Sequence, residues 1–167
     1  MNSIPDHLRA GLKIVFIGYN PSIMSSETGH HYANPNNRFW NILFQAGLTP
    51  KKLSAFEDAA LLEYGYGLTN IVERPTRAAD EITKEEYIEG AQKLREKLTL
   101  YMPEAACYVG KGVYQAFSGQ RQVTWGWQTG SAVQGVKDFV APSSSGLVRM
   151  KLSDIINIYR ELLEFPG

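Results

Sequence analysis

The sequence predicts an α/β protein in three layers, with a mostly parallel central sheet and helices on both of its faces. Two observations carry this prediction: short apolar runs rich in β-branched and aromatic residues recur along the chain, and segments with the spacing of amphipathic helices lie between them. Strands that alternate with helices in this way form parallel sheets. No internal repeat or linker-like tract interrupts the alternation, so we expect one domain over residues 1–167.

The expected strands are three apolar runs and one shorter segment. Residues 13–18, 105–109 and 133–141 have the composition of buried strands, and residues 64–72 are expected to form a loop that leads into a strand ending near Thr69 and Asn70. The stretch 118–130 is rich in Gly, Gln and Trp, and its pattern assigns no element. For its tryptophans, Trp125 and Trp127, core packing is favoured over a base-stacking surface.

The expected helices differ in how clearly their ends are marked. Asn36 or Asn37 begins a helix that Gly47 ends, and Thr83 with Glu86 forms a capping box at the start of a long helix up to residue 101. Other helices are expected around residues 59–62, over residues 113–117 after a tight turn at 110–112, and over the amphipathic segment 152–163.

Composition excludes several classes of protein. The chain is long enough to fold without a metal or a disulfide, and its single cysteine, Cys107, permits neither an internal disulfide nor a cysteine-ligated iron–sulfur cluster. No apolar stretch approaches the roughly 18 residues of a membrane span, and the N-terminus lacks the apolar core of a secretion signal. We therefore expect a cytoplasmic protein that contacts no membrane.

The charge balance bears on nucleic-acid binding. The chain carries 17 Lys and Arg against 17 Asp and Glu, which alone argues against a nucleic-acid partner. Residues 105–151 nevertheless hold five basic residues against one acidic residue. Such an excess can hold phosphates, although charges scattered over a solvated surface would give the same count.

Polar residues follow the predicted strands. Asn20, Asn70 and Ser143 each lie at or just beyond a strand end, and parallel strands place their carboxyl ends at one edge of the sheet, where ligands commonly bind. The loop after the first strand adds further polar residues, among them Ser25 and His31. We therefore expect these positions to meet at one rim and to line a pocket.

Five short segments resemble, in order and spacing, those of the mismatch-specific uracil/thymine DNA glycosylases. They are Gly-Tyr-Asn-Pro-Ser at 18–22, Gly-His-His-Tyr at 29–32, Asn-Asn-Arg-Phe-Trp at 36–40, Leu-Thr-Asn-Ile-Val-Glu-Arg at 68–74 and Pro-Ser-Ser-Ser at 142–145. Each motif alone is weak, whereas five in register form a specific signal. The resemblance implies an enzyme of the uracil-DNA glycosylase type that needs no metal or cofactor and cuts the bond between deoxyribose and a pyrimidine mispaired with guanine.

The resemblance also implies roles for single residues in the first loop. Asn20 matches the catalytic asparagine that positions the attacking water; alternatively, it only forms the turn before Pro21. Tyr32 matches the aromatic residue on which the flipped base stacks; alternatively, it is a tyrosine packed in the core or on the surface. Because an amide is neutral, we predict slow chemistry. His31 and Ser25 lie in the same loop and could hydrogen-bond the base or the water.

Two further expectations concern the base and metals. Asn70 stands where thymine-active relatives have an asparagine that faces the base, and an amide can both donate and accept at a pyrimidine edge; a strand-end cap is the alternative. A metal role for His30 and His31 is not expected, because adjacent side chains diverge and the sequence offers no evident third ligand.

The segment 142–149 resembles the loop that fills the hole left by a flipped base. Leu147, preceded by Gly146, is the expected wedge. Expected phosphate contacts are Ser143, Ser145, Arg149, Lys151 and Lys111, although a solvated lysine is an equal alternative for Lys111. The Ser-Ser-Ser run resembles the eukaryotic branch and Gly-Leu the bacterial one, so the choice between uracil and thymine stays open.

We expect a monomeric, monofunctional enzyme of base-excision repair, because no lysine matches a Schiff-base position. Its expected partners are double-stranded DNA with G·U or G·T mispairs and the abasic product, with ethenocytosine as a further candidate base. A module that binds mispaired or abasic DNA without turnover is the alternative that the neutral Asn20 leaves open. A nucleotide-binding protein ranks last, because no Gly-rich phosphate fingerprint follows the first strand.

Overall fold

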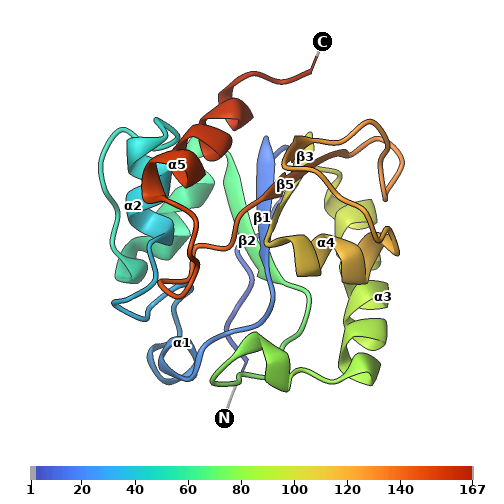
Figure 1. Cartoon of the computed structure of the whole chain (residues 1–167), viewed down its shortest axis with the longest axis horizontal. Helices are drawn as coiled ribbons and strands as arrows, with labels where there is room; N and C mark the ends of the chain where they lie inside the picture. The colour runs from blue at the N-terminus through green and yellow to red at the C-terminus, as the bar shows by residue number, and fades with distance from the viewer. Residues whose placement is uncertain (1–2, 167) are drawn as a thin grey trace.

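The computed structural model describes residues 3–166 and has the predicted three-layer α/β architecture (Figure 1). Within these residues, one sheet has five strands in the order β2-β1-β3-β5-β4. The strands are β1 (Ile14–Gly18), β2 (Tyr66–Asn70), β3 (Ala105–Val109), β4 (Gly126–Trp127) and β5 (Lys137–Ala141). Neighbouring strands are parallel except β4 and β5, which are antiparallel. The mostly parallel sheet is therefore confirmed.

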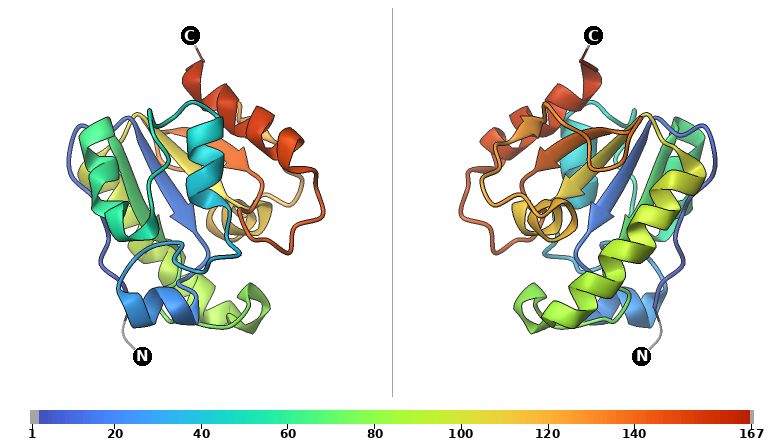
Figure 2. Two further views of the ribbon diagram at one scale, coloured as in Figure 1. Left: turned by 90° about the vertical axis from the view of Figure 1, so that its left-hand side faces the viewer. Right: turned by 90° about the vertical axis from the view of Figure 1, so that its right-hand side faces the viewer.

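Helices cover both faces of the sheet (Figure 2). On one face lie α2, α5 and the 3₁₀ helix η1, and on the other lie α3 and α4. The bounds of the helices are α1 (Ile23–Thr28), α2 (Phe39–Gln45), η1 (Ala55–Tyr64), η2 (Ala79–Glu81), α3 (Lys84–Tyr101), α4 (Lys111–Ser118), α5 (Leu152–Arg160) and η3 (Glu161–Leu163).

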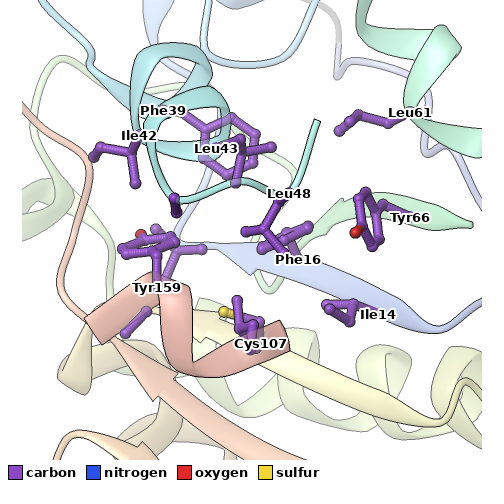
Figure 3. Packing of buried hydrophobic residues seen from close by; sticks show 14 of the residues in the cluster. Ile14, Phe16, Phe39, Ile42, Leu43, Leu48, Leu61, Tyr66, Cys107 and Tyr159 are labelled. Atoms are coloured by element: carbon purple, nitrogen blue, oxygen red, sulfur yellow. The ribbon is translucent and has the colours of Figure 1, made fainter. Parts of the chain in front are cut away.

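Each face of the sheet has its own hydrophobic core, because successive residues of a strand point to opposite sides. Phe16 of β1 belongs to the core under α2 and α5, where it packs against Phe39 and near Tyr159 (Figure 3). Val15 and Ile17 belong to the core under α3 and α4. With both faces covered, β1 and β3 are buried along their whole length, as central strands of a parallel sheet are.

The long helix α3 begins as the sequence predicts. The Thr83 hydroxyl accepts a hydrogen bond from the backbone N–H of Glu86, and the Glu86 carboxylate accepts one from the backbone N–H of Thr83. The helix ends at Met102, which has a left-handed conformation, before Pro103. Across residues 3–166, no helix has both the length and the apolar character that crossing a membrane requires.

Two predicted boundaries on either side of α4 were wrong. The turn expected at 110–112 is already helical, because α4 begins at Lys111 and Gly110, with φ 117°, is its N-terminal cap. The last strand begins at Lys137 rather than at residue 133, because the N–H of Val136 donates to the carbonyl of Val133 and closes a turn there. A single positive-φ glycine and one local turn decide these boundaries, and apolar composition reports neither.

Two segments acquire structure that the sequence did not assign. The polar loop after β1 contains α1, whose first turn is capped by the Ser22 hydroxyl, an acceptor for the Ser25 N–H at 3.0 Å. The stretch 118–130 contains β4, in which Trp127 packs edge-on against Phe139 with ring centroids 5.0 Å apart. Trp125 packs at the margin of the other core, so the core-packing prediction for both tryptophans is confirmed.

Candidate active site

A cavity of about 970 Å³ lies at the carboxyl edge of the sheet, where the loops after β1 and β2 gather at the lower side of Figure 1. Asn20, Asn70 and Ser143 all line it, as the sequence predicts. Its walls come from the loop and helix α1 after β1, the segment after β2, and the segment after β5. A chamber of this size is within the range of small-ligand pockets and can hold a nucleotide.

Asn20 lies in the cavity wall with its side-chain amide fixed. Its Nδ2 donates to the carbonyl of Arg74 at 2.7 Å and to the hydroxyl of Thr76 at 2.8 Å. The Thr76 hydroxyl in turn donates to the carbonyl of Ala78 at 2.7 Å, so it is an acceptor toward Asn20. These bonds use both hydrogens of the amide and leave Oδ1 as the group that can accept a hydrogen bond from a water.

Tyr32 is held in a strained conformation at the back of the cavity. Its φ is 52°, a value that non-glycine residues rarely adopt, and its ring stacks on Phe39 with centroids 3.9 Å apart. A flipped base could therefore stack only on the opposite face of the ring. The hydroxyl is buried without a hydrogen-bond partner among the described residues, and burial raises the pKa of Tyr32 well above its ordinary value.

Gly18, the last residue of β1, makes room for two polar groups of the cavity. A Cβ at this position would lie 2.6 Å from Oδ1 of Asn70 and 2.8 Å from the hydroxyl of Tyr32. Any larger residue would push apart the two side chains that were predicted to contact the base. The motif at 18–22 predicts no separate role for Gly18; the one signal in the sequence is a glycine at the end of a buried strand.

His31 and Ser25 line the cavity, but protein groups already bind them. His31 is 2% exposed, and its Nε2 donates to the carbonyl of Pro5 at 2.8 Å. Burial lowers the pKa of His31, so the ring is neutral near pH 7. The Ser25 hydroxyl accepts the N–H of Ala33 at 3.0 Å. Both residues thus shape the loop that carries Tyr32.

The segment 142–149 is an ordered turn that is attached to the start of α2. Ser143 and Ser145 accept hydrogen bonds from backbone N–H groups two residues further on, each at 3.2 Å. Arg38 holds the turn twice, because its backbone N–H donates to the Ser144 carbonyl at 2.9 Å and its guanidinium to the Ser145 carbonyl at 3.1 Å. Leu147 at its tip is 89% exposed. The sequence predicted the exposed leucine but not the role of Arg38.

Three expected phosphate contacts, Lys151 among them, lie outside the cavity lining. Lys111 lies with its ammonium 4.3 Å from the centroid of the Trp125 ring, a cation–π contact outside the cavity lining, and Arg149 is exposed outside that lining as well. The basic residues that line the cavity are Arg38 and Arg77. Arg77 lies in the segment between β2 and η2, and no sequence motif marked it as a site residue.

A cluster of polar residues lies behind the cavity wall, around the buried carboxylate of Asp58. His30 Nδ1 is 3.1 Å from Oδ1, His7 Nε2 is 3.2 Å from Oδ2, and the backbone N–H of His31 donates to Oδ2 at 2.9 Å. Burial opposes ionisation of Asp58, but the hydrogen bonds from the His31 N–H and from His30, together with the ion pair with His7, outweigh it and lower the pKa of the carboxyl. The sequence reasoning missed His7 and Asp58, which stand 23 or more residues from the His30–His31 pair.

The fold and the cavity define an α/β protein with its ligand site at the carboxyl edge of the sheet. Residues 5–164 match the uracil DNA glycosylase superfamily, so the chain belongs to that superfamily. A solution NMR structure from Methanosarcina acetivorans, described as a "putative Uracil DNA glycosylase", is similar, with 21% identity, a TM-score of 0.60 and 98% of each chain covered. At that identity the likeness shows the shared fold. Membership of the superfamily makes the protein a DNA glycosylase, a hydrolase that acts on DNA.

Proposed function

We propose that the protein is a monofunctional, mismatch-specific glycosylase that removes uracil opposite guanine from double-stranded DNA and acts as a monomer. Thymine and ethenocytosine opposite guanine are candidate further substrates. The observation that carries the proposal is the amide of Asn20, which Arg74 and Thr76 fix with its oxygen free, in the same cavity as Tyr32 and Asn70. The five motifs in register support the assignment to the mismatch-specific branch.

The target base must leave the duplex to reach this cavity. Flipping a nucleotide takes about a few kcal/mol, and less for a mispair than for a matched pair, so weak pairing supplies part of the selectivity. Leu147, at the tip of the turn that Arg38 holds, is the side chain that would enter the vacated space. Arg77 in the cavity lining replaces Lys111 and Arg149 as the basic residue placed to meet a phosphate of the flipped nucleotide.

The chemical step separates charge. The bond from C1′ to N1 breaks, its electron pair leaves with the base, and the sugar becomes oxocarbenium-like before water adds at C1′ and loses a proton. Asn20 Oδ1 accepts a hydrogen bond from that water and orients it, while the amide of Asn70 can donate to a carbonyl oxygen of the departing base. Because neither amide carries charge, the step is slow compared with catalysis by a carboxylate.

The proposal that the enzyme is monofunctional has structural support. No lysine is among the residues, within the described 3–166, that line the cavity, so no lysine amine of this part of the chain is placed to attack C1′. The abasic site would then be released intact. Borohydride trapping of a covalent complex with abasic DNA would contradict this part of the proposal.

The test is single-turnover base release from duplexes that contain G·U, G·T, A·U or G·C, with wild type beside Asn20→Ala. We expect release from G·U to exceed release from A·U and to fall by about 100-fold or more in the variant, as when one positioned group is lost at an active site. Release from G·T would add thymine to the substrates. Asn157→Ala is the matched control, because Asn157 is an exposed amide on α5, outside the cavity lining.

The outcomes separate two functions. If wild type and Asn20→Ala both release no base but bind G·U or abasic duplexes, the protein is a DNA-binding module and the assignment of Asn20 fails. If Asn157→Ala loses activity as Asn20→Ala does, the loss reflects general damage to the fold rather than a role in positioning the water.

A further inference from the structure

All three histidines of the chain surround one carboxylate. The sequence contains His7, His30 and His31 and no other histidine. One nitrogen each of His7 and His31 and one oxygen of Asp58 lie within 4.8 Å of one another. His30 lies on the far side of the same carboxylate, with its Nδ1 3.1 Å from Oδ1. Neither water positioning nor base stacking uses these ring nitrogens.

His31 has the bonding pattern of a metal-binding histidine. Its Nε2 faces the carbonyl of Pro5 at 2.8 Å, and a carbonyl can only accept, so Nε2 carries the proton and Nδ1 keeps its lone pair. Metal-ligating histidines commonly donate their second ring N–H to a backbone carbonyl in this way, which fixes both the tautomer and the orientation of the ring. His31 is 2% exposed, so the pattern is formed inside the protein.

His7 is placed like a ligand rather than a hydrogen-bond donor. Its Nε2 lies 3.2 Å from Oδ2 of Asp58, yet this buried nitrogen makes no hydrogen bond of acceptable geometry among the described residues. Two ligands that bind zinc tetrahedrally at about 2.0 Å stand roughly 3.3 Å apart. The distance between His7 Nε2 and Asp58 Oδ2, and their poor alignment for a hydrogen bond, both fit two groups that face a common ion.

We propose that His7, His31 and Asp58 form a binding site for a divalent transition-metal ion of the zinc class, with His30 holding the outer oxygen of the Asp58 carboxylate. Imidazole nitrogens with one carboxylate are a ligand set that suits Zn²⁺ and not Mg²⁺ or Ca²⁺, which take oxygen ligands. The expectation that the His30–His31 pair has no metal role rested on the divergence of adjacent side chains and on the lack of an evident third ligand. The two side chains do diverge, and only His31 of the pair belongs to the proposed site. The fold supplies two more groups, from the N-terminal segment and from η1.

The ion would join three segments that are distant in sequence. His7 belongs to the chain before β1, Asp58 to η1, and His31 directly precedes Tyr32 in the cavity wall. Bound metal would therefore stiffen the loop that carries Tyr32 without touching the reacting atoms. This structural role does not depend on the proposed substrate or on any glycosylase activity.

The test is metal titration of the full chain without a histidine tag, after removal of metals with a chelator. Co²⁺ is the spectroscopic probe, because its visible absorption reports tetrahedral coordination, and calorimetry with Zn²⁺ measures affinity and stoichiometry. We expect one ion per chain, displacement of Co²⁺ by Zn²⁺, and a higher Tm with Zn²⁺. Cys107 is fully buried in the core, so its thiol does not compete.

His7→Gln carries the test, because the His7 side chain is partly exposed and its loss leaves the core intact. We expect His7→Gln to weaken Zn²⁺ binding by about 100-fold and to abolish the rise in Tm, with an unchanged circular dichroism spectrum. Glu89→Gln, an exposed carboxylate on α3, is the control that should bind as wild type does. Absence of the Co²⁺ band in wild type, or equal Zn²⁺ affinity in His7→Gln, would overturn the proposal.

Discussion

Two buried aspartates lie on opposite sides of the sheet, and their ionisation is shifted in opposite directions. Asp58 is 2% exposed and Asp138 is 1% exposed, so burial raises the pKa of both. Around Asp58, imidazoles and a backbone N–H outweigh burial and lower the pKa below 3.8. Around Asp138, burial prevails over its hydrogen bonds and the pKa is raised.

The partners of the two carboxylates explain the difference. Asp138 accepts from the hydroxyl of Tyr114 at 2.9 Å, the N–H of Ala132 at 2.8 Å and, weakly, the hydroxyl of Tyr108 at 3.4 Å, all uncharged groups. Asp58 faces histidines, which can carry a positive charge. A nearby positive charge does not by itself separate the two, because Arg95 also acts on Asp138. Burial outweighs the favourable interactions of Asp138, whereas the N–H of His31 and the side chains of His30 and His7 outweigh burial at Asp58.

The largest expected effect is that of Asp58→Asn at neutral pH. The substitution replaces a charged acceptor of two hydrogen bonds, from His30 and the N–H of His31, by a neutral one. Hydrogen bonds contribute about 1.5–3 kcal/mol to charged groups and about 0.5–1.5 kcal/mol to neutral ones, so we expect a loss of about 2–3 kcal/mol in the free energy of unfolding. Urea unfolding with a chelator present measures it. Base release should fall as well, because His31 holds the loop of Tyr32. An unchanged unfolding free energy would show that the histidine partners do not stabilise the carboxylate.

The pH dependence of stability should distinguish the two aspartates. Because the pKa of Asp58 is lowered in the folded protein, its carboxylate stabilises the fold above pH 3.8, the ordinary pKa of an aspartate. This stabilisation is lost as the pH falls through the pKa of the folded protein. Because the folded pKa of Asp138 is raised, stability falls as the pH rises from 3.8 through that value. As the pH rises, the difference in the free energy of unfolding between wild type and Asp58→Asn should widen. The difference between wild type and Asp138→Asn should narrow. Urea unfolding in chelator from pH 3 to 7, at steps of about one pH unit, measures both differences. Stability curves of wild type and variants that stay parallel over this range would contradict the assignment.

The smallest effect is expected for Asp138→Asn at neutral pH. The amide oxygen can still accept from Tyr114 and Ala132, and the new N–H₂ can donate to Tyr108, so every partner keeps a hydrogen bond. We expect a change within about 1 kcal/mol and no change in base release, because Asp138 lies outside the cavity lining. A loss as large as that of Asp58→Asn would show that Asp138 is ionised and stabilised like Asp58.

The sequence was sufficient for those parts of the fold that local pattern determines. The β-branched run before Asn20 and the run around Cys107 predicted β1 and β3, and parallel pairing then predicted that Asn20, Asn70 and Ser143 meet at one edge. Helix α1 was missed because its six residues, rich in Ser and Thr, show no apolar spacing. Composition and spacing described the elements well wherever neighbours in sequence are also neighbours in space.

The rest of the candidate site depends on contacts between distant residues. Asp58 meets His31 across 27 residues and Arg38 meets Ser145 across 107, and no local pattern connects such partners. The sequence did not predict that Lys111 lies over Trp125, fourteen residues further along the chain, and its phosphate contact stays a prediction. Gly18 matters because a Cβ at this position would collide with Asn70 and Tyr32, and only the folded chain shows that these residues are close.

The contact between Arg38 and the turn at 143–147 has a consequence for how the enzyme matures. Its two partners are 107 residues apart. Contacts of such long sequence separation require a large loop to close, so they form late in folding. On the ribosome, the turn with Leu147 cannot dock on α2 until all five strands of the sheet have been synthesised. The turn that carries the proposed wedge is therefore assembled after the sheet that supports it.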